Sequence, residues 1–177
     1  MPKARKPRPT KLAEGIKAAE DLLQTLPSIS KDIDKLAEEF YNKYMFYEYR
    51  DLIELKKEIL GIKPAIEKAL ELLSKVVPFY EELPLLFEYR PIKNLDDLYN
   101  IAEKIEFAID YLATQCDIRA RRLLIKLTTT RIKKEKIIEL TEEIETLTKV
   151  KDILEKEWYR FNDLKYKIYY MKKSLAR

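Results

Sequence analysis

Apolar residues recur at every seventh position through residues 130–175, and this repeat limits the possible folds more than any other feature. Its members are Leu140, Leu147, Leu154, Phe161, Ile168 and Leu175. A second apolar position of the repeat contains Ile137, Ile144 and Trp158. Where a lysine occupies this second position, the residue before it is apolar instead: Val150, Leu164 and Met171. This drift is typical of a nearly straight helix of 3.6 residues per turn. Such a helix would span roughly 65–70 Å, so we expect other long helices along it, from this chain or a second copy.

The rest of the composition favours an all-α protein. Only Gly15 and Gly61 are glycines among 177 residues, whereas all-β folds and nucleotide-binding loops usually need more. We predict a bundle of four to five helices over residues 12–177, with a long C-terminal helix and an extended basic arm over residues 1–11. The Lys-, Glu-, Ile- and Tyr-rich, Gly-poor composition is also similar to that of proteins from hot environments.

Proline, glycine and capping residues predict where the helices begin and end. Thr10 caps a first helix to about Thr25, which Leu26-Pro27-Ser28 breaks, and a second helix runs from there to Ile59 with Gly61 as its C-terminal cap. A third helix spans Ala65 to Val77, and an apolar, Pro-containing connector packs against the bundle. Asn94 caps a fourth helix that ends at Thr128–Thr130, and Thr130 caps the last one.

The sequence FYNKYMFYEYR lies at the centre of the predicted second helix. Helical spacing places Phe40, Tyr44 and Tyr47 on one face and Tyr41, Met45 and Tyr49 on another, so we expect this helix to be covered on two sides. A thick core, packing between subunits and base stacking are the three explanations, in that order of preference. The residues predicted at a subunit interface are Tyr41, Tyr44, Met45, Tyr47, Tyr49 and Trp158.

The net charge of +4 hides a strong asymmetry. Residues 12–118 hold 13 basic and 22 acidic side chains, whereas residues 119–136 hold eight basic side chains against Glu135 alone. The arm, MPKARKPRPTK, has five basic residues, three prolines and no acid. It is either a solubilising or targeting tail or an arm that binds a polyanion, and the second basic stretch favours the latter.

These two stretches are the candidate nucleic-acid-binding surfaces, because Lys and Arg bind phosphates without reading base sequence. The predicted contacts are Lys3, Arg5, Lys6, Arg8, Lys11, Arg119, Arg121, Arg122, Lys126, Arg131, Lys133 and Lys134. Arg119, Arg122 and Lys126 share one helix face at a spacing of three and four residues. We expect arm and patch to act separately, since they lie on different elements.

Residues suited to other chemistry are scarce. The sequence contains no histidine, which excludes His-based triads and His metal sites. Cys116 is the only cysteine, and we expect it to be a small core residue. No phosphate-binding loop or nucleophile motif occurs, so we expect no enzyme activity, no catalytic residues, no metal and no cofactor. No apolar run approaches the length of a membrane span, and we expect a soluble, intracellular protein.

Two functions fit these observations. One is a structural nucleic-acid-binding protein that packs with copies of itself; the other is a protein–protein adaptor that dimerises through its C-terminal helix. The basic arm, the FYNKYMFYEYR segment and the Gly-poor, all-α composition resemble the major coat proteins of filamentous, lipothrixvirus-type viruses of hyperthermophilic archaea. The resemblance implies paired coat subunits, of one or two kinds, that wrap double-stranded DNA non-specifically. It implies location in the virion or the host cytoplasm.

Overall fold

The computed structural model describes residues 10–77 and 83–176, and in this part of the chain it contains five α-helices and no strand. The helices are α1 (Lys11–Asn42), α2 (Phe46–Leu60), α3 (Ile62–Leu73), α4 (Leu95–Thr129) and α5 (Lys134–Leu175). The predicted all-α bundle of four to five helices with a long C-terminal helix is therefore confirmed.

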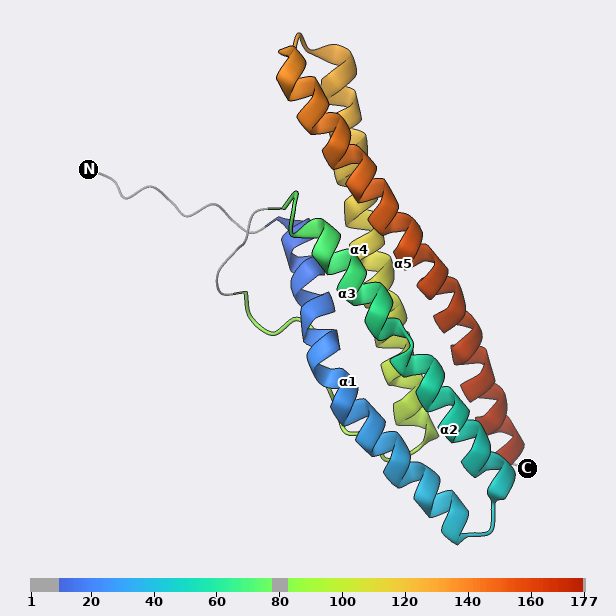
Figure 1. The fold of residues 1–177 in the computed structure, drawn as a ribbon. Coiled ribbons are helices and arrows are strands. Elements are labelled where there is room, and N and C mark those ends of the chain that lie inside the picture. The colour runs from blue at the N-terminus through green and yellow to red at the C-terminus, as the bar shows by residue number, and fades with distance from the viewer. Residues whose placement is uncertain (1–9, 78–82, 177) are drawn as a thin grey trace.

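The five helices form four rods, because α2 and α3 run almost end to end (Figure 1). Gly61 joins them with helical backbone angles (φ −62°, ψ −12°), so the boundary predicted there is a slight interruption and not a sharp turn. The α2–α3 rod and α4 each pack against both α1 and α5. We call this four-rod region the body.

The helices α4 and α5 are longer than the body and extend beyond the ends of α1 and α3 as an antiparallel pair (Figure 1). We call residues 119–138, where this pair turns back on itself, the hairpin tip. The α1–α2 turn and the C-terminal end of α5 lie at the opposite end of the molecule. The chain therefore has two well-separated ends joined by the body.

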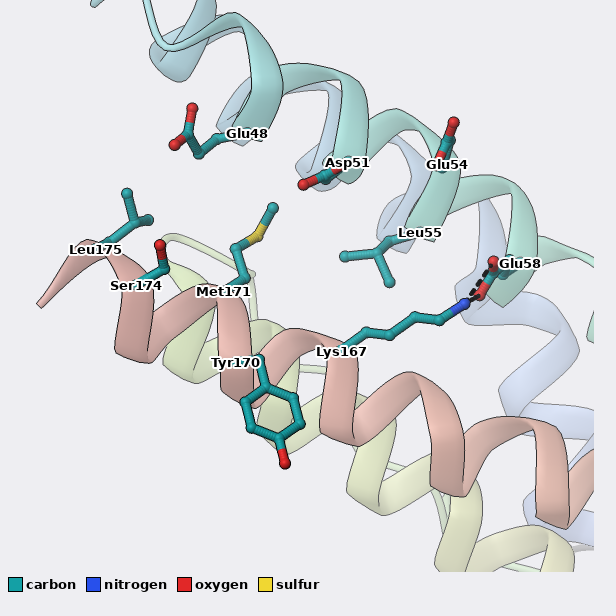
Figure 2. Close-up of a pocket in the computed structure, with 10 residues that line it drawn as sticks. All are labelled: Glu48, Asp51, Glu54, Leu55, Glu58, Lys167, Tyr170, Met171, Ser174 and Leu175. Carbon is teal, nitrogen blue, oxygen red and sulfur yellow. Dashed lines mark hydrogen bonds and ion pairs between the residues drawn. The ribbon is translucent and has the colours of Figure 1, made fainter.

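The seven-residue repeat is buried along α5, as its periodicity predicts. Leu140, Leu147, Leu154, Phe161 and Ile168 are buried, together with Val150 and Leu164, and Leu175 and Met171 pack partly against the core. The helices α4, α3 and α2 of the same chain cover this stripe. Near its C-terminal end, Leu55 of α2 faces Met171, and Lys167 pairs with Glu58 at 3.1 Å (Figure 2). The long helix thus finds its partners within its own chain.

The predicted helix break at Leu26-Pro27-Ser28 is wrong, because α1 continues through Pro27. A proline inside a helix costs about 3 kcal/mol through its lost N–H and its steric clash. Leu22, Leu26 and Ile29 around it are all buried, and burial of each such side chain contributes about 1.5–3 kcal/mol. Pro27 itself is exposed, so packing of the opposite face outweighs the local defect.

The chain turns where the sequence predicted an unbroken aromatic helix. Tyr44 adopts a left-handed conformation (φ 61°), and the Met45 N–H donates to the carbonyl of Phe40 at 2.9 Å. The Tyr44 N–H donates to the carbonyl of Tyr41, which completes a Schellman-type helix end. Glycine usually occupies this left-handed position, so the tyrosine gave no signal for a turn. The assignment of the aromatic residues to two faces of one helix is therefore wrong.

The connector before α4 packs against α1, as predicted, through two carboxylates. Asp21 is 1% exposed and accepts the backbone N–H of Leu86 at 2.7 Å and that of Phe87 at 3.3 Å. Three helical turns later, Asp32 accepts the N–H of Ile92 at 3.0 Å and the hydroxyl of Tyr89. Burial and the bond to Asp32 raise the pKa of Tyr89. The two carboxylates thus satisfy backbone N–H groups that have no helix or sheet partner in this extended segment.

The helix caps follow the sequence except at the start of α5. Thr10 accepts the N–H of Ala13 at 3.1 Å, and Asn94 accepts that of Asp97 at 2.9 Å. The helix α4 ends at Thr129, within the predicted boundary. Thr130 is extended and does not cap α5, which starts four residues later without a side-chain cap.

Cys116 is a core residue, as predicted for a lone cysteine. Its side chain is fully buried, and burial raises the pKa of its thiol to about 12. At neutral pH the thiolate is therefore scarce, and its role is packing.

Candidate nucleic-acid interface

The basic residues singled out by the sequence fall into three groups. Lys3, Arg5, Lys6 and Arg8 lie outside the described residues. Lys11 is the first residue of α1, and it is exposed. The others, Arg119, Arg121, Arg122, Lys126, Arg131, Lys133 and Lys134, all belong to the hairpin tip.

A shallow hollow joins the start of α1 to the hairpin tip. It has a volume of about 330 Å³, and its lining includes Lys11, Arg119 and Arg122 with Thr10, Leu12, Gln115 and Ile118. The chain enters α1 at this hollow, so the arm is attached beside two of the arginines. Our expectation that arm and patch act separately because they lie on different elements therefore loses its basis. Lys11, Arg119 and Arg122 form one positive surface.

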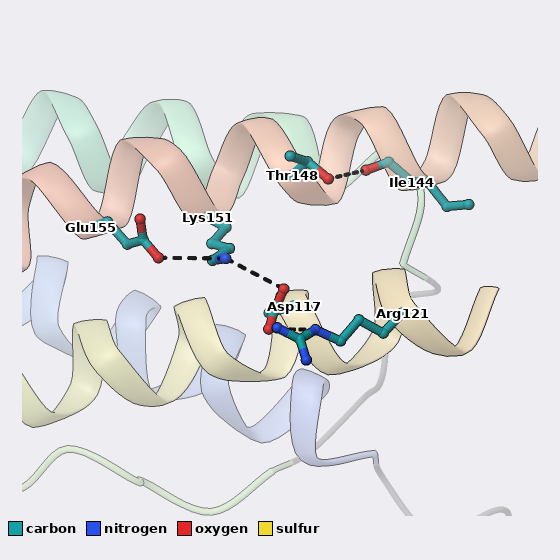
Figure 3. Close-up of polar contacts among 6 residues, drawn as sticks. All are labelled: Asp117, Arg121, Ile144, Thr148, Lys151 and Glu155. Atoms are coloured by element: carbon teal, nitrogen blue, oxygen red, sulfur yellow. Dashed lines mark hydrogen bonds and ion pairs between the residues drawn. The ribbon is translucent and has the colours of Figure 1, made fainter. Parts of the chain in front are cut away.

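Ion pairs reduce the charge that two of the tip arginines offer to a ligand. Arg119 contacts Glu143 of α5 through Nη2 and Oε1 at 2.9 Å. Arg121 contacts Asp117 at 3.1 Å, and Lys151 of α5 contacts the same carboxylate at 3.4 Å (Figure 3). The hydrogen bond to Asp117 raises the pKa of Lys151. The Arg119–Glu143 and Lys151–Asp117 pairs thus hold α4 against α5, whereas the Arg121–Asp117 pair lies within α4.

The remaining basic residues of the tip are exposed, and none of the ion pairs within residues 10–77 and 83–176 involves them. They are Arg122, Lys126, Arg131, Lys133 and Lys134. Lys136 is 3.5 Å from Glu139. The charge most available to a polyanion therefore lies at the turn between α4 and α5 and along the Arg122–Lys126 edge of α4.

The hairpin tip also exposes large aliphatic side chains, which sequence reasoning missed. Leu124, Ile125, Ile137 and Ile138 are 43–60% exposed. The inclusion of Ile137 in the buried stripe is wrong, because α5 at this point lies beyond the body and has only α4 beside it. The available signal was the density of basic residues around these aliphatic positions, which a buried helix does not tolerate.

The predicted subunit-interface residues do not form one surface. Tyr41, Tyr44, Met45, Tyr47 and Tyr49 surround the α1–α2 turn at the end opposite the tip. There the Tyr41 ring meets the rings of Phe46 and Tyr49 edge-on, at centroid distances of 5.2 and 5.3 Å. Tyr44 and Tyr47 are 83% and 75% exposed. Trp158 lies elsewhere, halfway along α5 and partly buried against the core.

Other kinds of site have little support within the described residues. Those residues contain no cluster of acidic or Cys side chains that could hold a metal ion. None of the helices they form is long and apolar enough to cross a membrane. Comparison with known proteins finds no match: no family model, no curated protein and no solved structure is similar to this chain.

Proposed function

We propose that this protein is a structural component that self-assembles and packages double-stranded DNA through non-specific phosphate contacts. The observation that supports the proposal best is the meeting of two basic stretches, far apart in sequence, at the base of the hairpin tip. Lys11 lies beside Arg119 and Arg122, and four more basic residues precede it in the sequence without an intervening acid.

The distribution of charge favours a DNA contact confined to this end. Residues 12–118, which form most of the body, contain 22 acidic and 13 basic side chains and would repel a phosphate backbone. The exposed Arg122, Lys126 and Arg131 can each contact a phosphate by charge, and arginine adds a bidentate fork. These contacts carry no base specificity.

The resemblance to filamentous archaeal virus coat proteins supports the same proposal, and under it the protein would be located in the virion or the host cytoplasm. Its protein partners are then further copies of the chain or a related coat subunit. The adaptor alternative has less support. Its dimerisation stripe on α5 is already covered by α4, α3 and α2 of the same chain.

The salt dependence of duplex DNA binding tests the proposal. Contacts with about six phosphates should give a log–log slope near −5, at ~0.9 per contact. The double variant Arg122→Gln/Lys126→Gln should flatten this slope by about 1.8. Arg121→Gln should change it less, because Asp117 already pairs with that arginine. Deleting residues 1–9 should flatten the slope further and weaken the effect of the double variant.

The matched control is Lys63→Gln/Lys68→Gln, which removes two exposed positive charges from α3 in the body. This control should bind DNA with the same slope as the unmodified protein. A flat salt response of the intact protein, or no binding at low salt, would refute the proposal. A strong preference for one base sequence would refute its non-specific part.

A further inference from the structure

An acidic groove lies at the end of the molecule opposite the hairpin tip. It runs between α2 and the last turns of α5 and has a volume of about 460 Å³ (Figure 2). Glu48, Asp51 and Glu54 form one wall, and none of the ion pairs in the described part of the chain involves them. Met171 and Leu175 contribute apolar surface on the facing helix.

This groove is the wrong surface for DNA and a suitable one for a cationic, partly apolar protein segment. Lys167 also lines the groove, but it pairs with Glu58 at 3.1 Å, which leaves Glu48, Asp51 and Glu54 without a cationic partner there. These three carboxylates repel one another, and an incoming positive group relieves that repulsion. The apolar surface of Met171 and Leu175 also favours an occupant with apolar side chains, because their burial adds binding free energy that a small cation cannot gain. The occupant should therefore present lysine or arginine next to aliphatic side chains.

The hairpin tip has this combination. Arg131, Lys133 and Lys134 lie at its turn, and Ile137 and Ile138 are exposed a few residues later. Phosphate contacts give no role to exposed aliphatic side chains, so DNA binding leaves this part of the tip unexplained. Clustered exposed aliphatic residues on a soluble surface are typical of protein interfaces.

We propose that the hairpin tip of one copy docks into the α2–α5 groove of the next copy. The two surfaces differ, so the contact is heterologous, and because they lie at opposite ends of an elongated molecule it propagates as an open chain. The Arg122–Lys126 edge beside Lys11 is not required for docking and stays available to DNA. This inference rests on the self-assembly part of the proposed function but does not depend on DNA binding.

Charge reversal on each surface gives a direct test without nucleic acid. The tip variant is Lys133→Glu/Lys134→Glu, and the groove variant is Asp51→Lys/Glu54→Lys. Each variant alone places like charges on both surfaces, so we expect its apparent association constant at low salt to fall at least about tenfold. In an equimolar mixture, each tip again meets a groove of opposite charge, and association should return. Sedimentation velocity over a concentration series measures all four samples.

Two further double variants make the same charge changes on α3 and the turn that follows it, away from both surfaces. They are Lys68→Glu/Lys75→Glu, matched to the tip variant, and Glu67→Lys/Glu71→Lys, matched to the groove variant. Both should associate like the unmodified protein. Glutamate is favourable at the start of a helix, so the tip variant should keep its helical circular dichroism. Leu55 remains unchanged in the groove variant, which preserves the α2–α5 packing.

The outcomes separate this inference from the proposed function. The unmodified protein should show a weight-average mass that rises with concentration past that of a dimer. A strictly monomeric protein at high concentration, a closed dimer unaffected by either variant, or two defective variants that do not complement each other would overturn the inference. DNA binding is measured separately at dilutions where the protein is monomeric. There the groove variant should bind at least as well as the unmodified protein, whatever the result for docking.

Discussion

The body of this molecule buries its large apolar side chains, whereas the two ends expose several of theirs. In the body, Leu22, Ile33 and Phe161 have no exposed surface, and the buried carboxylate of Asp21 is fully engaged. The hairpin tip exposes aliphatic residues among lysines and arginines, and the α1–α2 turn exposes aromatic residues close to an acidic groove. The body accounts for stability, which leaves the ends free for interactions.

The same substitution on one helix sharpens this comparison most strongly. Leu112 and Leu124 both lie on α4, but Leu112 is buried in the body and Leu124 is largely exposed at the tip. Leu112→Ala should lower the free energy of unfolding by about 2–5 kcal/mol through lost burial and a residual cavity. Leu124→Ala should change it by less than about 0.5 kcal/mol. Urea unfolding followed by circular dichroism measures both, and similar losses would mean that the tip belongs to the cooperative core.

Two carboxylates extend the comparison to polar contacts. Asp21→Ala in the body should cost about 2–3 kcal/mol, because it leaves the N–H groups of Leu86 and Phe87 without an acceptor. Glu143→Ala near the tip breaks a pair with the more exposed Arg119 and should cost at most about 1 kcal/mol. Thermal and urea unfolding measure the two effects.

The second variant has a further consequence under the proposed function. Removing Glu143 frees Arg119 for a phosphate, so the salt slope of DNA binding should steepen by up to about 0.9. An unchanged slope would exclude Arg119 from the DNA contact. A stability loss equal to that of Asp21→Ala would remove the distinction between body and tip in their polar contacts.

The sequence predicts the body of the molecule better than its ends. The seven-residue repeat predicted the buried stripe of α5 wherever α5 lies in the body, because there the pattern reflects three covering helices. The second position failed at Ile137, which is 43% exposed, because the covering helices end there and local periodicity does not record where a neighbouring rod stops. The predictions at Pro27 and Tyr44 were wrong because tertiary packing outweighed the local sequence signal. At Pro27 the helix continues through a strong helix breaker, and at Tyr44 the chain turns without a glycine.

The candidate site was predictable in composition but not in geometry. Counting charges located the basic stretches, and helical spacing grouped Arg119 with Arg122. Only the fold brings Lys11 beside them, because α1 begins where α4 leaves the body. The acidic groove could not be predicted, since its two walls are more than a hundred residues apart in the sequence.

The smallest expected effect concerns the strained end of α1. A non-glycine residue in the left-handed region costs about 1–2 kcal/mol relative to glycine, but glycine loses up to ~1 kcal/mol more conformational entropy on folding. Tyr44 also gives up its edge-on contact with Phe46, at 6.2 Å between centroids, when it is replaced. Tyr44→Gly should therefore stabilise the protein by only about 0.5 kcal/mol. Tyr47→Gly, at a similarly exposed position in the first turn of α2, should destabilise it by up to about 1 kcal/mol, the cost of glycine in a helix interior.

Opposite signs of the two stability changes in paired urea melts would locate backbone strain at the α1–α2 turn, where a tyrosine occupies a position that favours glycine. A loss for Tyr44→Gly as large as that for Tyr47→Gly would mean that the turn is unstrained, and that the Tyr44 ring contributes to the stability of the monomer.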